Sequence, residues 1–431
     1  MKPLIRSIRA LEILDSRGNP TLSVEVEASS GVRAAAQVPS GASTGKHEAV
    51  ELRDGDPARY SGKGVRRAVE NVERVLAPAL EGQPVEEQAE IDGAMIALDG
   101  SPDKSRLGAN ALLGISCAVA RVAAQSLGVP LWQYLAGNRT PALPLPMVNI
   151  LSGGLHAGKN LEFQDFLAIP SGMESYSEAL EAVVDVHKAA RALLIEGGYA
   201  LTGVADEGGW GPLLPSNEAA LRMLTQAIER AGYVPGRDVS IALDVAATHF
   251  HCDGRYQLSS ESRTLESGEL VELLAGWAGR YPVVSIEDGL AEDDWEGWKV
   301  LTARLGNRLQ LIGDDLFTTN PRRLERGIRD GAANAVLVKM NQIGTLTETF
   351  TVLDKALAAG FHAVISARSG ETEDSFLADL AVASGAGQIK VGSITRSERL
   401  AKYNRLLEIE RGGQCAYVSA RFRGGLTAIS G

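Results

Sequence analysis

Four charged residues stand where short apolar runs of the chain end. Asp244, Glu287, Asp314 and Lys339 each close or follow a run rich in Ile, Leu and Val, and each run precedes a stretch with helical periodicity. Runs of this composition favour strands. In a barrel of parallel strands the carboxyl ends meet at one mouth, where enzymes of this architecture keep their catalytic groups. We therefore expect three carboxylates and one amine to face the same place.

The three carboxylates predict a site for a hard metal ion. An all-oxygen donor set suits a small cation such as Mg²⁺, which keeps water or substrate oxygens as its remaining ligands, whereas zinc prefers cysteine and histidine. A single acidic residue at a strand end more commonly caps a helix or faces solvent. Three of them in register, followed by a lysine, favour the metal site over that ordinary role.

The lysine of the set could act as a base. Lys339 ends an otherwise apolar strand, and a lysine in that position is either salt-bridged to a neighbouring acid or functional. A nearby dication and partial burial would both lower its pKa, which would suit a general base. The chemistry that follows is removal of a proton next to a carboxylate, with the metal ion offsetting the enolate-like charge.

Elimination would also need an acid that protonates the departing group. The segment Asp206-Glu207-Gly208-Gly209 offers one, because glycines after a carboxylate let the backbone approach a ligand closely. The same residues would suit an acidic turn in a surface loop, which on local grounds is the commoner role. Glu207 is therefore one candidate acid with an ordinary structural alternative.

Two domains are expected to position these residues. The 431 residues exceed the roughly 100 to 200 of a usual domain. Pro141, Pro144 and Pro146 follow one another closely and disfavour helix, so we place the boundary there. The predicted domains are residues 1–138, an N-terminal α+β domain, and residues 141–431, which carry the metal and catalytic residues.

The first domain reads as a small sheet packed on helices. Leu22, Val24 and Val26 alternate with polar residues as in a half-buried strand, and helical patterns follow over residues 65–76 and 107–135. Beyond the boundary, strand-like and helix-like segments alternate, which favours right-handed β-α units around parallel strands. We predict helices there over residues 217–231, 269–280, 321–329, 346–359, 372–383 and 397–409.

Local signals add detail to this pattern. Asn320 suits the N-cap of a helix and Pro321 its first position. Two further apolar runs, over residues 362–366 and 388–392, lead to Arg368 with Ser369 and contain Lys390. The mouth of the barrel should thus have a cationic side as well as an acidic one.

Composition excludes several classes of function. Asp plus Glu number 54 against 43 Lys plus Arg, and the net charge of −11 argues against nonspecific nucleic-acid binding. No uninterrupted apolar stretch approaches the roughly 20 residues that span a bilayer, and the N-terminus lacks a secretory signal. The three cysteines cannot all pair. We expect a soluble cytoplasmic protein that binds neither nucleic acid nor membrane.

Several longer motifs occur in order along nearly the whole chain. They are DSRGNPT at 15–21, PSGASTG at 39–45, DEGG at 206–209, SIEDG at 285–289, GDDL at 313–316, Lys339 with NQIG at 341–344, and SGETED at 369–374. With these motifs the chain resembles enolase, the phosphopyruvate hydratase of glycolysis. The resemblance implies an N-terminal α+β capping domain and a modified (β/α)8 barrel, an α/β fold whose first units depart from strict alternation.

The resemblance also implies roles for particular residues. Asp244, Glu287 and Asp314 look like ligands of a structural Mg²⁺, and Ser43 like the residue that helps to hold a second, catalytic Mg²⁺. Lys339 resembles the base that takes the α-proton of 2-phosphoglycerate. The other expected roles are the acid, Glu207, and the contacts to this small phosphorylated acid, His156, Gln164, Asp165, Arg368, Ser369 and Lys390.

His156 and Ser43 have ordinary alternatives. Without the resemblance, His156 would be read as a hydrogen-bonded structural histidine, and the loop around Ser43 as a plain surface turn. The other five histidines carry no comparable motif. By the same resemblance the protein is expected to form a homodimer, or an octamer assembled from dimers.

Two positions depart from the family pattern. Enolases ordinarily read Ser-His-Arg-Ser where this chain has Ser366-Ala367-Arg368-Ser369, and a Gln-Glu pair appears here as Gln164-Asp165. The second change shortens a carboxylate near the acid by one methylene, and a misplacement of about 1 Å can cost roughly 10²-fold in rate.

Three functions remain open at this point. The first is an Mg²⁺-dependent lyase that dehydrates 2-phosphoglycerate to phosphoenolpyruvate. The second is a specialised dehydratase for a related, bulkier acid, because Ala367 leaves space beside the phosphate contacts. The third is a noncatalytic binding or scaffold protein, which would have no need of a complete acid-base pair.

Overall fold

The N-terminal domain is a three-stranded sheet covered by helices. The computed structural model describes residues 2–41 and 45–418. Strands β1 (Ile5–Leu14), β2 (Pro20–Ala28) and β3 (Arg33–Gln37) form an antiparallel sheet in the order β1-β2-β3. Leu22, Val24 and Val26 are fully buried, which confirms the predicted alternation. They face the long helix α4 (Ala109–Leu127), which packs across β2 and β3.

The other helices of this domain pack against α4 or against β1. They are α1 (Arg66–Asn71), the π-helical turn η2 (Val72–Leu76), α2 (Ala77–Leu80), α3 (Gln88–Asp99) and α5 (Leu131–Ala136), with a 3-10 turn η1 (Tyr60–Gly62) before them. The predicted helical patterns near 65–76 and 107–135 are thus confirmed. By length and composition, α4 alone among the described helices could cross a membrane, yet 78% of that stretch is buried, as in a core helix.

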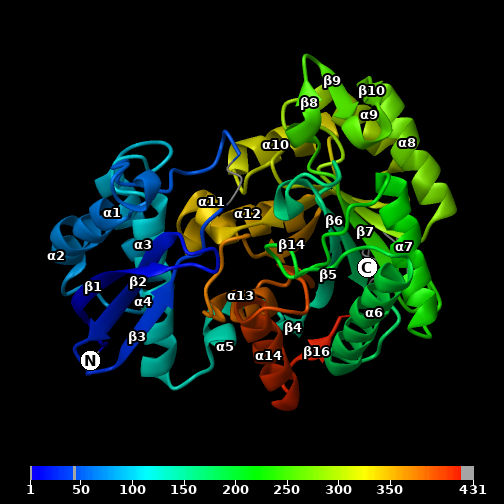
Figure 1. Cartoon of the computed structure of the whole chain (residues 1–431). Helices are drawn as coiled ribbons and strands as arrows, with labels where there is room; N and C mark the ends of the chain where they lie inside the picture. Colours follow the sequence, from blue (N-terminus) through cyan, green and yellow to red (C-terminus); the bar gives the residue numbers. More distant parts are fainter. Residues whose placement is uncertain (1, 42–44, 419–431) are drawn as a thin grey trace.

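The second domain is a closed barrel of eight strands (Figure 1). Its strands follow the circular order β11-β12-β13-β14-β15-β5-β6-β7. Their bounds are β5 (Leu145–Ser152), β6 (Asp165–Ile169), β7 (Ser240–Asp244), β11 (Val283–Glu287), β12 (Gln310–Gly313), β13 (Ala335–Val338), β14 (His362–Ser366) and β15 (Gln388–Gly392).

One strand of the barrel runs against the others. β6 pairs antiparallel with both β5 and β7, whereas the remaining neighbours pair in parallel. Antiparallel strands need no crossover helix, and the segment between β5 and β6 contains only the 3-10 turn η3 (Gly154–Ala157). The expected departure from strict alternation is therefore confirmed. As a consequence, the amino end of β6, with Gln164 and Asp165, lies at the mouth.

Helices surround the barrel in the predicted alternation. They are α6 (Tyr176–Glu196), α7 (Asn217–Arg230), α8 (Ser267–Arg280), α9 (Trp295–Leu305), α10 (Pro321–Asp330), the short α11 (Met340–Ile343), α12 (Leu346–Ala358), α13 (Phe376–Ala383) and α14 (Ser397–Arg411). The six helices predicted from periodicity are present. Three of these helices, α6, α9 and α11, were not predicted. Neither was the small sheet of β8 (His251–Cys252), β9 (Arg255–Leu258) and β10 (Arg263–Leu265).

Local capping explains the well-marked start of α10. The Asn320 side chain accepts a hydrogen bond from the Arg322 N–H at 3.0 Å, and Pro321 occupies the first turn. Gly331 ends the helix at φ 67°, in the left-handed region that glycine adopts without strain. The predicted helix start is confirmed.

The barrel interior below the mouth is apolar. Its strands contribute Leu145, Met147, Leu167, Ile169, Ala242, Ile312, Ala335, Leu337 and Val364 to one buried cluster, separate from the larger core between strands and helices. Inward side chains fill a barrel of this size, so it holds a packed core and no pore. Asp244 and Glu287 stand beyond this cluster, as the last residues of β7 and β11.

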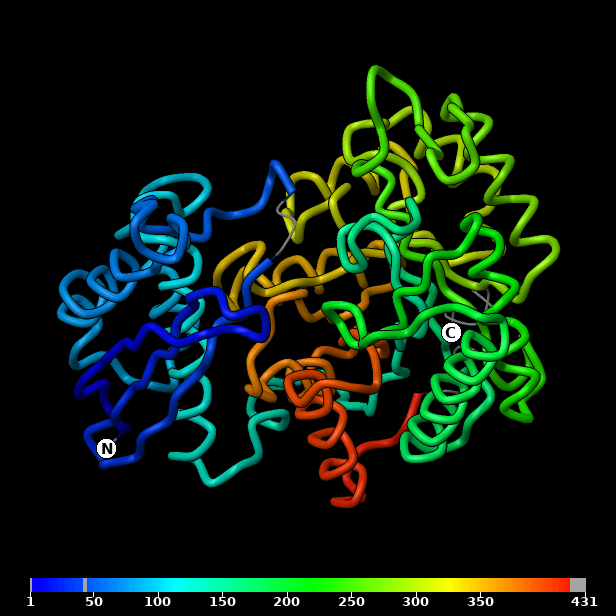
Figure 2. Tube along the Cα trace, in the orientation of Figure 1, coloured from blue at the N-terminus to red at the C-terminus, as the bar shows by residue number. Residues whose placement is uncertain are grey.

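The two domains lie side by side, as the trace in Figure 2 shows. Ser40 and Gly370 exchange two backbone hydrogen bonds, of 2.7 and 2.9 Å, that tie the first domain to the loop after β14. Arg121 pairs with Asp374 across the same boundary. At the far side, β16 (Ala416–Tyr417) pairs with β4 (Ala142–Leu143) in the connection between the domains. The N-terminal domain therefore reaches the loops that surround the mouth.

Candidate active site

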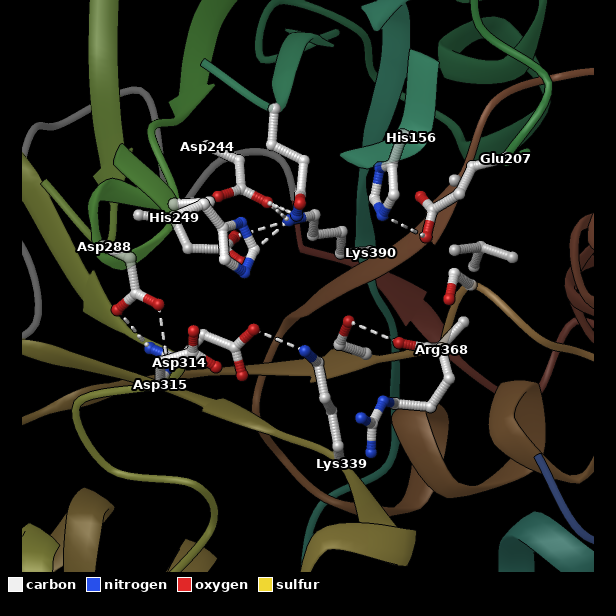
Figure 3. A pocket seen from close by; sticks show the side chains of 18 residues that line it. His156, Glu207, Asp244, His249, Asp288, Asp314, Asp315, Lys339, Arg368 and Lys390 are labelled. Carbon is white, nitrogen blue, oxygen red and sulfur yellow. Dashed lines mark hydrogen bonds and ion pairs between the residues drawn. The ribbon is translucent and has the colours of Figure 1, made fainter. Parts of the chain in front are cut away.

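One cavity at the barrel mouth gathers the predicted residues (Figure 3). It is lined by His156, Gln164, Glu207, Asp244, Ala246, His249, Glu287, Asp288, Asp314, Asp315, Lys339, Ser366, Ala367, Arg368, Ser369, Lys390, Val391 and Gly392. Ten of the predicted site residues are in this set. Asp165 does not line the cavity, and Ser43 lies outside the described residues.

Asp244 and Glu287 share one ammonium group. They are direct neighbours in the register of β7 and β11. Lys390 Nζ lies 2.7 Å from Asp244 Oδ2 and 2.7 Å and 2.8 Å from the two carboxylate oxygens of Glu287. Gln164 Nε2 also donates to Asp244 at 3.2 Å. All four side chains are buried. The two carboxylates therefore need a positive charge beside them, because bulk water does not solvate them.

Asp314 is held by a second cation. Lys339 Nζ donates to its Oδ2, and Gln342 Nε2 donates to its Oδ1 at 3.2 Å. Thr319 then links Gln342 to the backbone, because its hydroxyl donates to Gln342 Oε1 and accepts from the Lys339 N–H. The base candidate and the third carboxylate therefore form one network.

The predicted metal ligands are near one another but are not drawn tightly together. Among the described residues, Asp288, Asp314 and Asp315 bring ligand atoms within 4.8 Å of one another, whereas Asp244, Glu287 and Asp314 do not form such a group. The ammonium of Lys390 lies between Asp244 and Glu287, and that of Lys339 binds Asp314. Two lysines thus offset part of the charge of the three carboxylates.

The close spacing of the buried carboxylates shifts their pKa values. Burial and the neighbouring charges of Asp244 and Asp314 hold the pKa of Glu287 well above its usual range, against the lowering effect of Lys390. Burial also acts to raise the pKa of Asp244, but Lys390 lowers it below its ordinary value. A small hard cation fits this donor set, because buried carboxylate oxygens with excess negative charge are its preferred ligands.

Without a bound dication, the pKa of Lys339 is raised. Burial lowers it, as expected, but the adjacent carboxylate of Asp314 raises it, and the net direction is upward. The expected lowering depends on a bound dication, so it stays a prediction for the metal-bound protein. Negative charge outweighs desolvation here, and only added positive charge on the carboxylates would reverse the direction.

Asp288 organises the acidic turn and was missed from sequence. Its carboxylate accepts the backbone N–H groups of Asp314 and Asp315 at 2.9 and 2.8 Å. Its own backbone is in the left-handed region at φ 42°, which is uncommon for a residue other than glycine. Burial and the neighbouring Asp314 raise the pKa of Asp315 to about 7. The SIEDG motif contained Asp288, but nothing local indicated this bond.

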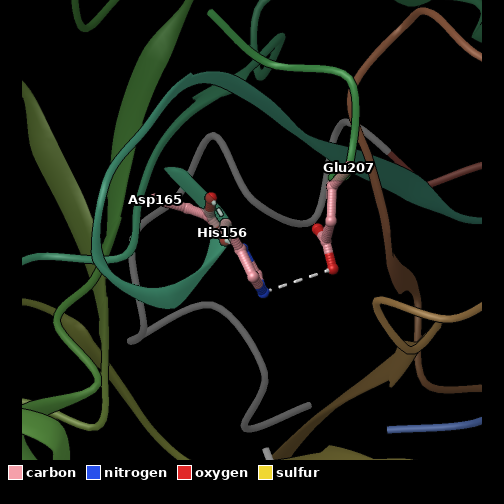
Figure 4. A group of neighbouring side chains, drawn as sticks. All are labelled: His156, Asp165 and Glu207. Atoms are coloured by element: carbon pink, nitrogen blue, oxygen red, sulfur yellow. Dashed lines mark hydrogen bonds and ion pairs between the residues drawn. The ribbon is translucent and has the colours of Figure 1, made fainter. Parts of the chain in front are cut away.

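His156 is held between two carboxylates (Figure 4). Its Nδ1 lies 3.2 and 3.3 Å from the two oxygens of Asp165, and its Nε2 lies 3.7 Å from Glu207 Oε1. Burial lowers the pKa of His156, but these two carboxylates raise it to about 9. Glu207 shows the converse: burial raises its pKa, and the charges of His156 and Arg399 bring it below its usual value.

Asp165 lies one layer behind the cavity wall. It is fully buried, and Asn149 Nδ2 donates to one of its oxygens while also donating to Ser152 Oγ at 2.8 Å. Burial raises the pKa of Asp165 to about 6 despite the opposing charge of His156. The structure therefore places Asp165 against His156, although the resemblance implied a contact to substrate.

The cationic side of the mouth receives support from the first domain. Arg368 Nη1 donates to Glu48 and to Asn341 Oδ1, both at 3.0 Å. Arg17 Nη1 donates to Ser369 Oγ at 3.2 Å. Glu48 and Arg17 stand more than 300 residues before their partners, so local sequence could not predict these contacts, although Arg17 lies in the DSRGNPT motif.

His249 lines the cavity but was not predicted from the sequence. It follows β7 in the 3-10 turn η4 (Ala247–Phe250), while Ala367 follows β14. These two strands are four apart in the eight-stranded circle, so the two residues approach the cavity from opposite walls. Figure 3 shows His249 on the side of Asp244, away from Arg368. The space beside Ala367 is therefore not filled by this ring.

Comparison with known proteins connects the geometry to a family. Residues 5–135 match the family model described as enolase, N-terminal domain, and residues 140–424 match that described as enolase, C-terminal TIM barrel domain. A curated relative from Rubrobacter xylanophilus, named enolase, is 57% identical over 406 residues, which are 94% of this chain and 94% of the relative.

Proposed function

The chain belongs to the enolase family, and we propose that it dehydrates 2-phosphoglycerate to phosphoenolpyruvate with Lys339 as base and Glu207 as acid. The observation that carries this assignment is that both side chains line one cavity, together with the three carboxylates at the ends of neighbouring strands. A carbon-oxygen lyase needs such an acid-base pair.

Lys339 is the proposed base because of its position. It stands at the end of β13 beside Asp314, with its Nζ inside the cavity. A neutral Lys339 would take the proton from the carbon next to the substrate carboxylate. Mg²⁺ bound by Asp244, Glu287 and Asp314 would supply positive charge that stabilises the developing enolate oxygens and favours the neutral amine. Ser43 is proposed to help hold a second Mg²⁺.

Glu207 is the proposed acid, with His156 as the source of its proton. The raised pKa of His156 and the lowered pKa of Glu207 place the proton of this pair on the imidazole. Transfer from Nε2 to the Glu207 carboxylate would prepare the acid, which then protonates the departing hydroxide to form water. The substrate thus loses its α-proton to Lys339 and its hydroxyl group as hydroxide, which together amount to the one water eliminated. Lys339 then gives its proton to solvent, and the His156–Glu207 pair regains one from solvent.

The remaining cavity residues are proposed to orient the substrate. Arg368 and Ser369 would bind the phosphate, since a planar guanidinium suits phosphate oxygens and lies on the cationic side of the mouth. Gln164 and Lys390 lie beside Asp244 and would bind the carboxylate end. His156 also borders this space.

A second candidate function rests on Ala367. This residue lines the cavity beside Arg368 with only a methyl group, so a related and bulkier acid derived from 2-phosphoglycerate would find space there. A noncatalytic scaffold is disfavoured, because the acid-base pair and the carboxylates are all retained in one cavity. Comparing kcat/KM for 2-phosphoglycerate with kcat/KM for larger analogues distinguishes these two candidate activities.

We further propose that the protein is cytoplasmic and forms a homodimer, or an octamer of dimers, with domains divided between residues 138 and 141. Light scattering coupled to gel filtration measures the oligomeric state, and limited proteolysis maps the domain boundary.

The central test of the proposed activity uses purified protein with Mg²⁺ and 2-phosphoglycerate, and follows the ultraviolet absorbance of phosphoenolpyruvate. Folded, Mg²⁺-loaded protein that forms none would overturn the proposed function.

A further inference from the structure

Arg399 is a fully buried cation directly behind the cavity wall. It lies on α14 and has 0% exposure. Its Nη1 donates to the backbone carbonyls of Arg368 at 2.6 Å and Val391 at 2.9 Å, and its Nη2 donates to the carbonyl of Ser369. A buried guanidinium is costly unless its hydrogens are bonded, so these carbonyls determine where the group can lie.

The three carbonyls belong to two separate segments of the mouth. Arg368 and Ser369 follow β14, whereas Val391 lies in β15 next to Lys390. One planar group therefore sets the distance between the phosphate side and the carboxylate side of the cavity. Lysine could not do the same, because its donors radiate from a single nitrogen.

The same side chain also packs near the acid. Gly392 has φ +114°, and a Cβ built on it would lie 3.1 Å from Glu207 Cβ and 3.2 Å from Arg399 Cδ. The backbone of Gly392 is thus enclosed between the two side chains without room for one of its own. The next residue, Ser393, donates its N–H to the carbonyl of Glu207 at 2.8 Å. Glu207 is therefore attached to the segment that Arg399 holds.

We propose that Arg399 is a positioning residue that holds Arg368, Ser369 and Lys390 in the spacing that substrate binding requires, and keeps Glu207 in register with them. It does not touch the substrate. The inference rests on the proposed function, because the spacing matters only if these residues bind one small acid together.

The substitution Arg399→Lys tests this directly, since it retains the buried charge. Displacement of about 1 Å at a reacting centre costs roughly 10²-fold in rate, so we expect kcat/KM for 2-phosphoglycerate to fall by about that factor. A large part of this decrease in kcat/KM should come from a higher KM. Calorimetric titration with phosphoenolpyruvate in the presence of Mg²⁺ should show weaker binding to the folded variant.

Arg405→Lys is the matched control on the same helix. Arg405 makes a bidentate pair with Asp379, with contacts of 2.9 and 2.8 Å, and does not line the cavity. We expect this variant to lose thermal stability while KM and phosphoenolpyruvate affinity stay unchanged. A structural defect alone would reduce the amount of active enzyme without changing either quantity.

Chemical rescue adds a second measurement. In Arg399→Ala, guanidinium ion at low millimolar concentration should restore part of the activity, whereas sodium at equal ionic strength should not. Arg399→Lys with wild-type KM and wild-type phosphoenolpyruvate affinity would overturn the proposal. Failure of the proposed function is distinguishable, because it would appear as an inactive wild-type protein.

Discussion

The carboxylate of Asp165 lies 3.2 Å from Nδ1 of His156, and the opposite nitrogen of that ring faces Glu207 at 3.7 Å. Asp165 itself is fully buried outside the cavity lining. The Asp165 carboxylate therefore contacts the imidazole of His156, and that imidazole faces the proposed acid, Glu207. The effect of Asp165 on the rate should pass through His156.

Stability should depend on pH through His156. Its pKa is about 9 in the folded chain and about 6.5 when unfolded, so its stabilising effect is complete below pH 6.5 and is lost as pH rises through 9. At roughly 1.4 kcal/mol per pKa unit, the effect is about 3 kcal/mol at most. Urea unfolding between pH 6 and 9.5 should show this slope for the wild type and not for His156→Gln. Parallel profiles for the two proteins would contradict it.

Asp165→Asn should disconnect the ring from its carboxylate. Removing the charge should lower the pKa of His156 toward 6.5, which nuclear magnetic resonance of the ring can follow. We expect kcat to fall roughly 10²-fold, because the imidazole loses its fixed orientation. Asp165→Glu is the matched control, since it keeps the negative charge. In this variant the pKa of His156 should stay raised even if the longer side chain packs less well. An unchanged His156 pKa in Asp165→Asn would refute this relation.

Lys339→Ala should abolish dehydration while the fold persists. The variant removes the only amine beside Asp314 in the described cavity. We expect no exchange of the substrate α-proton with deuterated water, together with a circular dichroism spectrum like that of the wild type. In Glu207→Gln, by contrast, α-proton exchange should continue without elimination. Exchange retained in Lys339→Ala would assign the base to another residue.

Ala367→His tests whether the cavity is adapted to 2-phosphoglycerate. A ring here would add one hydrogen bond beside Arg368, and a bond worth about 1 kcal/mol would raise kcat/KM roughly fivefold. Steady-state kinetics with 2-phosphoglycerate measure the change. Ala367→Phe, of similar size without ring nitrogens, separates hydrogen bonding from filled space. A lower rate in Ala367→His would favour the bulkier substrate.

Magnesium should bind with release of protons. Burial and Asp244 raise the pKa of Glu287, and a carboxylate must be deprotonated to bind a metal ion, so Mg²⁺ should compete with a proton for this group. Calorimetric titration of Mg²⁺ in buffers of different ionisation enthalpy measures the number released. At 100 times the dissociation constant, Mg²⁺ should add about 2.7 kcal/mol to stability. Asp314→Asn should weaken both effects.

Local pattern was enough to predict six of the eight strands of the barrel and six of its helices. Helices and strands repeat at periods of 3.6 and 2 residues, so apolar spacing and caps such as Asn320 show where each lies. Residues at strand ends then share a mouth because the strands are parallel, and this placed Asp244, Glu287, Asp314 and Lys339 in one cavity. The longer motifs, such as SGETED at 369–374, indicated the family and most of the other site residues.

Contacts between distant segments could not be predicted in this way. The ammonium of Lys390 lies between Asp244 and Glu287, which precede it by 146 and 103 residues, and Glu48 reaches Arg368 across 320 residues. Such pairs depend on how strands wind around a barrel and how a second domain covers it. The chain by itself therefore determined which groups could do the chemistry. Tertiary structure decided how their pKa values shift and which side chains hold them in place. Electrostatic coupling depends on separation in space and on burial, and local periodicity predicts neither of these.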